Sequence, residues 1–147
     1  MQTATIPARI SIVTLGVRDL AAASAFYEAL GWERTSSSSD EIVWFRTVGP
    51  YLGLFPWREL AADANRPGEP EPAFGGVTLA INVEREEDVA TFLETAVAAG
   101  GTLLRPARRI EAIGVTAGYF ADTDGHPWEV AWNPAFPLDE HGSITIP

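Results

Sequence analysis

One order of elements, a strand, a helix and then three strands, occurs twice along this chain, and this repeat limits the folds open to it. Alternating apolar residues predict strands, and a run of helix formers that begins after Asp19 and stops at Gly31 predicts a helix. The first copy has expected strands at 10–17, 32–36, 42–47 and 51–55 and a helix at 20–30. The second copy has expected strands at 77–83, 102–105, 116–121 and 128–132 and a helix at 86–99.

The two copies share identical residues in a single register. Val17 with Val83, Phe26 with Phe92, and Glu28 with Glu94 all fall at an offset of 66 residues. Because these identities lie inside matching elements, they support an internal duplication rather than chance similarity. We predict one α+β domain over 1–147 with two tandem βαβββ modules. The divisions are a first module at 8–57, a linker at 58–74, a second module at 75–133 and a tail at 134–147.

Composition excludes several classes of function. The chain of 147 residues has ten basic residues, all of them arginine, and a formal net charge of −10, so nucleic acid is not an expected partner. Without lysine or cysteine there is no Schiff-base lysine, no thiolate nucleophile and no disulfide. No apolar run is long enough to span a bilayer, and a signal-peptide pattern is missing at the start. We therefore expect a cytoplasmic protein that does not bind membranes.

An acidic turn and a lone carboxylate mark the segment from Gly118 to Asn133. Asp122, Asp124 and Gly125 are residue types that favour tight turns, which predicts a hairpin. After the turn, large apolar residues alternate with Glu129. Since side chains alternate between the two faces of a strand, Glu129 is expected to point away from the core, toward solvent or a ligand.

The duplicated βαβββ pattern, the segment LGVRDLAAASAFYEALGW and the segment FADTDGHPWEV together resemble the vicinal oxygen chelate superfamily over Ile10 to Asn133. This group includes glyoxalase I, extradiol dioxygenases, and fosfomycin- and bleomycin-resistance proteins. The resemblance implies two modules whose strands form a cup-shaped mixed sheet with helices outside. It also implies a divalent metal in the cup in the enzymes of the group. Because the fold hosts lyases, dioxygenases, transferases and binding proteins, it does not by itself assign an activity.

The resemblance places the four metal-ligand positions at Ile12, Gly53, Thr78 and Glu129. Isoleucine and glycine have no side-chain donor and threonine is a poor ligand, so this set argues against the usual metal site. His126 is interpreted as a turn residue, and His141 as a solvated or interface residue of the acidic tail. We therefore predict no metal and no other cofactor.

Without a metal, the cup is expected to bind a small molecule, and the aromatic residues and the carboxylate suit an aromatic or cationic ligand. Its predicted ligand-binding residues are Ile12, Thr14, Trp44, Tyr51, Phe55, Trp57, Thr78, Asn82, Tyr119 and Glu129, with Ala80 beside them. The first alternative is a lyase, isomerase or dioxygenase that uses Glu129 as a base or in an atypical metal site. The second is an interaction module whose cup is filled by its own side chains.

Several of these residues are also compatible with purely structural roles. Glu129 is compatible with a purely structural role, bonded to Thr78, Tyr119 or an arginine. Trp32, Trp128 and Trp132 are expected in the core, whereas Trp44 and Trp57 fit the cup or an interface equally well. A homodimer is expected. The tail is expected to pack on the domain or on its partner through Phe136 and Leu138.

Overall fold

The fold was analysed in a computed structural model that describes residues 5–66, 68–70 and 73–147. The first half contains strand β1 (Ile12–Val17), helix α1 (Leu20–Ala29), and strands β2 (Val43–Phe45) and β3 (Tyr51–Pro56). Helix α2 (Trp57–Asp63) connects it to the second half. The second half contains strand β4 (Leu79–Asn82), helix α3 (Glu87–Ala98), and strands β5 (Thr102–Ile110), β6 (Val115–Ala121) and β7 (Pro127–Trp132).

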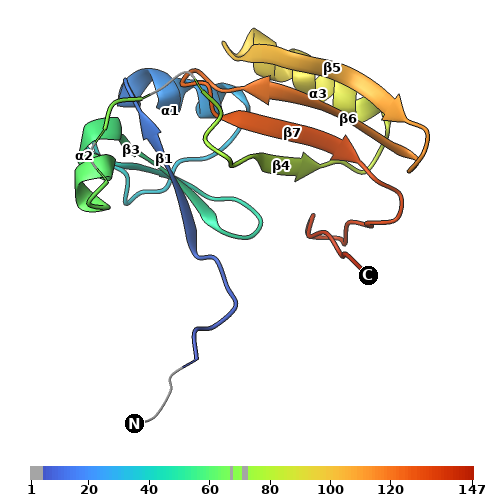
Figure 1. The fold of residues 1–147 in the computed structure, drawn as a ribbon, viewed down its shortest axis with the longest axis horizontal. Coiled ribbons are helices and arrows are strands. Elements are labelled where there is room, and N and C mark those ends of the chain that lie inside the picture. Colours follow the sequence, from blue (N-terminus) through green and yellow to red (C-terminus); the bar gives the residue numbers. More distant parts are fainter. Residues whose placement is uncertain (1–4, 67, 71–72) are drawn as a thin grey trace.

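The strands form two sheets with the same internal order. In each module the first strand pairs in parallel with the last one, which in turn pairs in antiparallel with the strand before it. The first sheet therefore runs β1-β3-β2 and the second runs β4-β7-β6-β5 (Figure 1). This shared topology agrees with the predicted α+β fold of two repeated modules.

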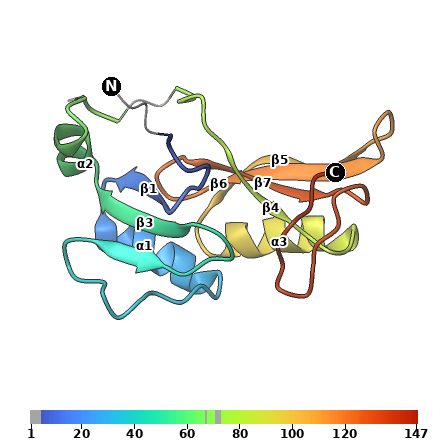
Figure 2. The same ribbon diagram turned by 90° about the horizontal axis from the view of Figure 1, so that it is seen from below.

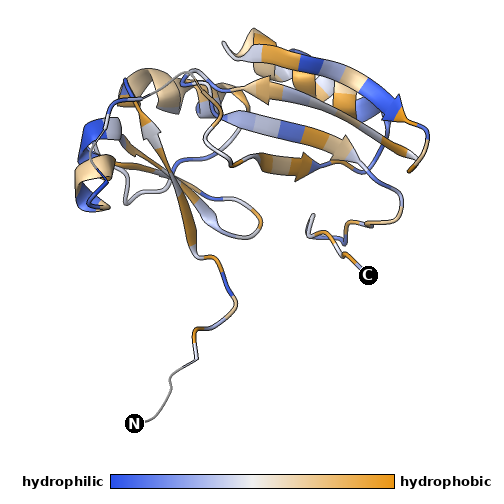
Figure 3. Cartoon of the chain, viewed as in Figure 1, coloured by the Kyte–Doolittle hydropathy of each residue, from blue (hydrophilic) through white to orange (hydrophobic). Residues whose placement is uncertain are grey.

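Each sheet carries its module's helix on one face. In Figure 2, α3 lies below the strands of the second sheet and α1 overlaps the strands of the first sheet, whereas α2 lies above β3 with the segment that leads to β4. Burial follows this layering: in β6 and β7, Phe120 and Val130 are buried in the core, whereas Tyr119 and Glu129 are half-buried on the other face. Figure 3 shows the resulting mixture of apolar and polar residues along β6 and β7. We call the side of each sheet opposite α1 or α3 its open face.

A buried hydrogen-bond network joins the two modules. The Tyr27 hydroxyl of α1 donates to Asp122 at 2.6 Å and accepts from the indole N–H of Trp128 at 3.1 Å. Asp122 also accepts from the backbone N–H groups of Asp124 and His126, both at 2.9 Å. The predicted hairpin turn is thus present, and its first carboxylate connects the second module to the helix of the first.

Four of the expected elements need correction. The strand expected at 32–36 is a single bridge between Arg34 and Phe45, because the serine-rich segment after it turns the chain away. The strand expected at 77–83 is shorter and spans only Leu79–Asn82. The strand expected at 102–105 continues to Ile110 through Pro106, which is tolerated because β5 is an edge strand and needs no N–H on its free side.

The fourth correction concerns the linker expected at 58–74, which contains helix α2. The segment WRELAAD consists largely of helix formers and follows a proline, and the helix ends near Asn65, whose φ is +53°. The surrounding prolines and charges concealed this short helix in the sequence. Residues 67, 71 and 72 of the expected linker lie outside the described residues.

The C-terminal tail folds back on itself. Leu138 and Ile144 form an antiparallel bridge, and Asp139 accepts hydrogen bonds from two backbone N–H groups of the turn between them. Phe136 and Leu138 are half-buried. Packing of the tail on the domain or on a partner through these two side chains stays a prediction. Among the described helices, none has the length and apolar character needed to cross a membrane.

Candidate functional site

Two indole rings cover the open face of the first sheet at its glycines. A Cβ added to Gly53 would lie 2.8 Å from the Trp44 ring, and one added to Gly16 would lie 2.8 Å from the Trp57 ring. Such distances are too short for a side chain, so glycine is what allows each indole to lie against the strand. Thr14 lies between them, opposite Gly53 in the β1-β3 pair. The sequence thus builds an aromatic surface where the resemblance places a metal ligand.

Beside this surface is a cavity of about 890 Å³. One wall is α2 with the residue that caps it, through Trp57, Leu60, Ala61 and Ala64, and another is β1 from Val13 to Gly16. Val77, Leu104 and Pro127 contribute apolar surface from the second module. Apolar walls with a few polar groups are the usual form of a small-molecule pocket, and this volume lies in the range of such pockets.

Polar groups gather where the β6-β7 hairpin meets the cavity. His126 Nε2 lies 2.7 Å from the Gly16 carbonyl oxygen, and since a carbonyl only accepts, Nε2 carries the proton. The His126 ring is stacked on Trp57, with centroids 6.3 Å apart. Asp124 accepts from the Arg18 backbone N–H at 2.8 Å, and burial raises the pKa of its carboxyl group. His126 therefore holds this end of the cavity together, beyond the simple turn role expected from the sequence.

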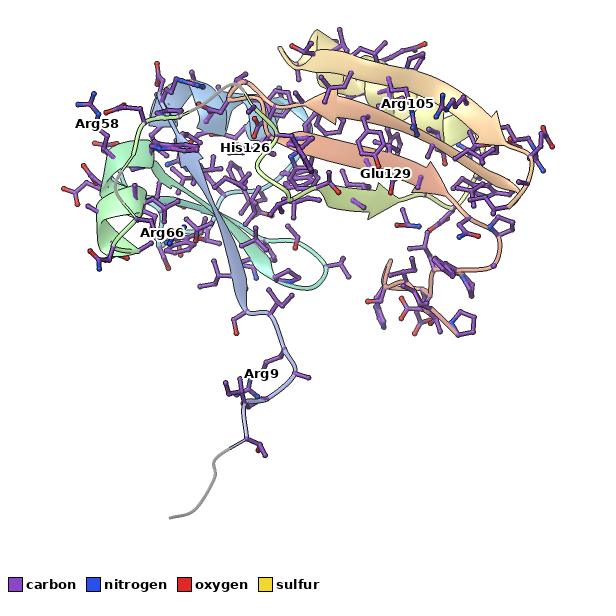
Figure 4. The ribbon with its side chains drawn as sticks, in the orientation of Figure 1. Arg9, Arg58, Arg66, Arg105, His126 and Glu129 are labelled. Carbon is purple, nitrogen blue, oxygen red and sulfur yellow. The ribbon has the colours of Figure 1, made fainter. Side chains whose placement is uncertain are left out.

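A row of polar side chains crosses the open face of the second sheet. Arg105 pairs with Tyr119, Tyr119 with Glu129, and Glu129 with Ala80, so all four share one face. The Arg105 guanidinium lies 4.9 Å from the centre of the Tyr119 ring, and the Tyr119 hydroxyl donates to Glu129 at 3.0 Å. Figure 4 shows Arg105 and Glu129 on β5 and β7 of this sheet. We call Arg105, Tyr119 and Glu129 the polar row.

The pKa of the Tyr119 phenol is raised in the polar row. Partial burial raises the pKa of Tyr119, and the adjoining Glu129 carboxylate raises it further by hydrogen bonding and by its charge. Tyr119 is therefore a neutral hydrogen-bond donor at neutral pH. Of the hydrogen-bond partners expected for Glu129 from the sequence, Tyr119 is the one that the structure shows.

The predicted ligand-binding residues are divided between the two halves of the chain, and two of them line this cavity. Thr14 and Trp57 line the cavity. Ile12, Trp44, Tyr51 and Phe55 belong to strands of the first sheet outside the cavity, and Thr78, Asn82, Tyr119 and Glu129 belong to the second half. The α2 wall and Arg105 were not predicted. The helix-forming segment WRELAAD was a usable signal for α2, whereas the stacking of Arg105 on Tyr119 depends on strand register, which no local pattern revealed.

The four metal-ligand positions do not fit a metal. Only Glu129 supplies a carboxylate, and it already accepts from Tyr119. At Gly53 the Trp44 ring occupies the space that a ligand side chain would need. In the described parts of the chain, no three His, Asp or Glu side chains converge as metal ligands would. The donor set therefore lacks the several convergent ligands that a catalytic metal requires.

Two related modules, with the second strand of the first one reduced to a bridge at Arg34, define the fold class, and sequence comparison names the family. Residues 9–130 match the model of the Glyoxalase/Bleomycin resistance protein/Dioxygenase superfamily, so the chain belongs to this family. No curated protein matches the sequence.

Solved structures agree with this assignment. A glyoxalase-related enzyme from Fulvimarina pelagi is 38% identical, with 95% of this chain and 99% of that chain covered and a TM-score of 0.86. A lactoylglutathione lyase from Agrobacterium tumefaciens is 26% identical over 87% of this chain and 96% of that chain, with a TM-score of 0.64. A family member from Burkholderia phytofirmans, at 22% identity, 85% and 98% coverage and a TM-score of 0.75, shows the shared fold.

Proposed function

We propose that this protein binds a flat, largely apolar, aromatic small molecule in the cavity between α2 and β1, without a metal. The observation that supports this most is the cavity itself, with the Trp57 indole and apolar side chains of both modules in its walls. Aromatic rings favour offset stacking on an indole, and an apolar ligand of this kind gains free energy from the surface it buries.

Polar groups at one end of the cavity support a defined orientation of the ligand. The hairpin presents His126 and Asp124 there, while the Trp57 indole N–H is held by the Gly68 carbonyl at 3.2 Å. A few fixed polar groups beside an apolar wall usually set which end of a ligand enters first. The proposal is therefore a binding protein that selects by shape and by one polar end.

Filling the cavity tests the proposal. Ala61 lines the cavity, whereas the next residue, Ala62, is exposed and does not. Ala61→Phe should abolish binding of 2-naphthalenemethanol, detected by the NMR signal of the Trp57 indole, while Ala62→Phe should leave binding unchanged. Equal binding by both variants, or no shift of the Trp57 signal in the unmodified protein, would contradict the proposal.

A second candidate is proton transfer by Glu129, as in a lyase, isomerase or dioxygenase of the family. The contact that favours it is the 3.0 Å hydrogen bond with Tyr119, which pairs a carboxylate with a neutral phenol. Glu129→Gln should then remove turnover of an α-hydroxycarbonyl substrate panel without changing ligand affinity at the cavity. Absence of turnover in the unmodified protein would leave the binding function alone.

We also propose a homodimer formed through the open face of the first sheet. Ile12 and Tyr51 pair across β1 and β3 and are 48% and 38% exposed, and Ile10, just before β1, is 72% exposed. A second copy would remove this apolar surface from water. Light scattering coupled to size exclusion should give twice the chain mass, and Tyr51→Glu should shift it toward the monomer.

A further inference from the structure

We propose that the ligand carries an anionic group, such as a carboxylate, which the polar row binds through Arg105 with help from Arg108. This inference rests on the proposed function, because the cavity is taken to hold the apolar body of the same ligand. In this inference the open face of the second sheet contacts the ligand, and the polar end of the ligand is negatively charged.

The cavity and the polar row involve neighbouring residues of the same strands. Leu104 lines the cavity and directly precedes Arg105. Pro127 also lines it, and Glu129 follows two residues later on the same face of β7. Two residues along a strand cover roughly 7 Å, about the length of one aromatic ring with its substituent. Arg105 and Glu129 therefore lie next to cavity-lining residues of β5 and β7, within reach of a ligand that extends from the cavity along the second sheet.

The Arg105 guanidinium is held in place, but its Nε–H group has no hydrogen-bond acceptor among the described residues. The guanidinium stacks on the Tyr119 ring, and its Nε is buried. A buried N–H without an acceptor is unfavourable, and a carboxylate that meets the edge of a guanidinium satisfies two donors at once. An anionic ligand would thus complete a contact that the protein leaves open.

The charges on this face favour an anion over a cation. Arg108 pairs with Ala117, which places it on the same face as Arg105, and neither arginine forms an ion pair with a described residue. Glu129 is the single carboxylate in the paired positions of this face, and Tyr119 already donates to it. Two guanidinium groups against one engaged carboxylate leave a local positive charge. This differs from the cationic ligand that Glu129 suggests when considered alone.

Three probes with one ring system test the inference: 2-naphthoate, 2-naphthalenemethanol and 2-naphthylmethylammonium. Affinity is followed by NMR, with the Trp57 indole reporting the cavity and the Tyr119 and Glu129 amides reporting the polar row. We expect 2-naphthoate to bind roughly tenfold more tightly than the alcohol, because it adds a charged hydrogen-bonded pair, and the ammonium to bind least.

Variants of β5 separate a specific contact from a general charge effect. Arg105→Gln should remove the advantage of 2-naphthoate over the alcohol and leave alcohol binding unchanged. Arg109→Gln is the matched control, because it removes the same charge from the same strand while Arg109 binds Glu86 and Glu111 instead. It should retain the advantage.

The outcomes distinguish this inference from the proposed function. If all three probes bind equally and Arg105→Gln changes nothing, the cavity function stands and the anion site is wrong. A preference for the ammonium, or equal losses in Arg105→Gln and Arg109→Gln, also overturns it. If no probe shifts the Trp57 signal, the proposed function fails, and the inference fails with it.

Discussion

The two modules share a topology but present different open faces. In the first sheet, Gly53 is covered by the Trp44 indole and Gly16 by the Trp57 indole. In the second sheet, Glu129 occupies the position that corresponds to Gly53 and belongs to a polar row with Tyr119 and Arg105. One repeat has thus become an aromatic surface and the other a polar one. In this duplicated fold the strand pairing is the same in both modules, whereas the residues at equivalent positions of the open faces differ.

The same divergence occurs on the helix side. Phe26 and Phe92 are equivalent in sequence, yet Phe26 is 1% exposed and Phe92 is 43% exposed. Helix α1 packs between its own sheet and the β6-β7 hairpin, where Phe26 meets Phe120 and Tyr27 meets Trp128. The main contacts of helix α3 are with β5, β6 and β7 of its own sheet. Identical residues in equivalent places therefore differ in burial, because the aromatic residues of the first helix also pack against the second module.

The largest expected effect comes from breaking this joint between modules. Asp122→Asn should lower the free energy of unfolding by about 2 kcal/mol, because the amide oxygen can still accept from the two backbone N–H groups but the amide nitrogen cannot accept from the buried Tyr27 hydroxyl. Urea unfolding measures the change. Asp124→Asn is the matched control and should cost less than about 1 kcal/mol, since its amide oxygen still accepts from Arg18. Equal losses would show that Asp122 has no special role.

The next effect tests the aromatic cover of the first sheet. Gly53→Ala should lower the free energy of unfolding by roughly 1 kcal/mol, because its Cβ meets the Trp44 ring at 2.8 Å. In a Trp44→Leu background the penalty should shrink, giving a coupling energy of at least about 0.5 kcal/mol in a double-mutant cycle. Additive changes would mean that Trp44 does not cover Gly53 in solution.

A smaller effect concerns the polar row of the second sheet. Glu129→Gln should lower the pKa of Tyr119, because the carboxylate stabilises the protonated phenol by accepting its hydrogen bond and by its negative charge. Alkaline difference spectra of each protein against its Tyr119→Phe counterpart measure this pKa. Glu94→Gln on α3 is the control and should leave it unchanged. A Tyr119 pKa that does not respond to Glu129→Gln contradicts the contact.

The smallest effect is a pH dependence at the hairpin. Burial raises the pKa of Asp124, so the folded state favours its neutral form. The resulting stabilisation is fully present below the ordinary aspartate pKa and is lost as pH rises through the raised value. The difference in unfolding free energy between Asp124→Asn and the unmodified protein should therefore shift in favour of the variant as pH rises. A difference that is constant across this range would contradict the shift.

The sequence predicted what local patterns encode and missed what depends on contacts between elements. The βαβββ repeat, the Asp19 helix start and the hairpin at Asp122 follow from periodicity and turn chemistry, and all three are present. The open-face orientation of Glu129 followed from strand alternation alone. By contrast, the cavity depends on α2 lying over β1, and the Arg105 stack depends on the register of β5 against β6. Neither is visible in one segment of sequence.

The difference between the two open faces has one direct test, the metal content of the protein. Glu129 lacks partners at the three equivalent positions, and the space at Gly53 is taken by Trp44. Protein purified without chelators should therefore contain only substoichiometric transition metal by elemental mass spectrometry, and its affinity for 2-naphthoate should not change with EDTA. One bound metal per chain that disappears in Glu129→Gln would contradict the account.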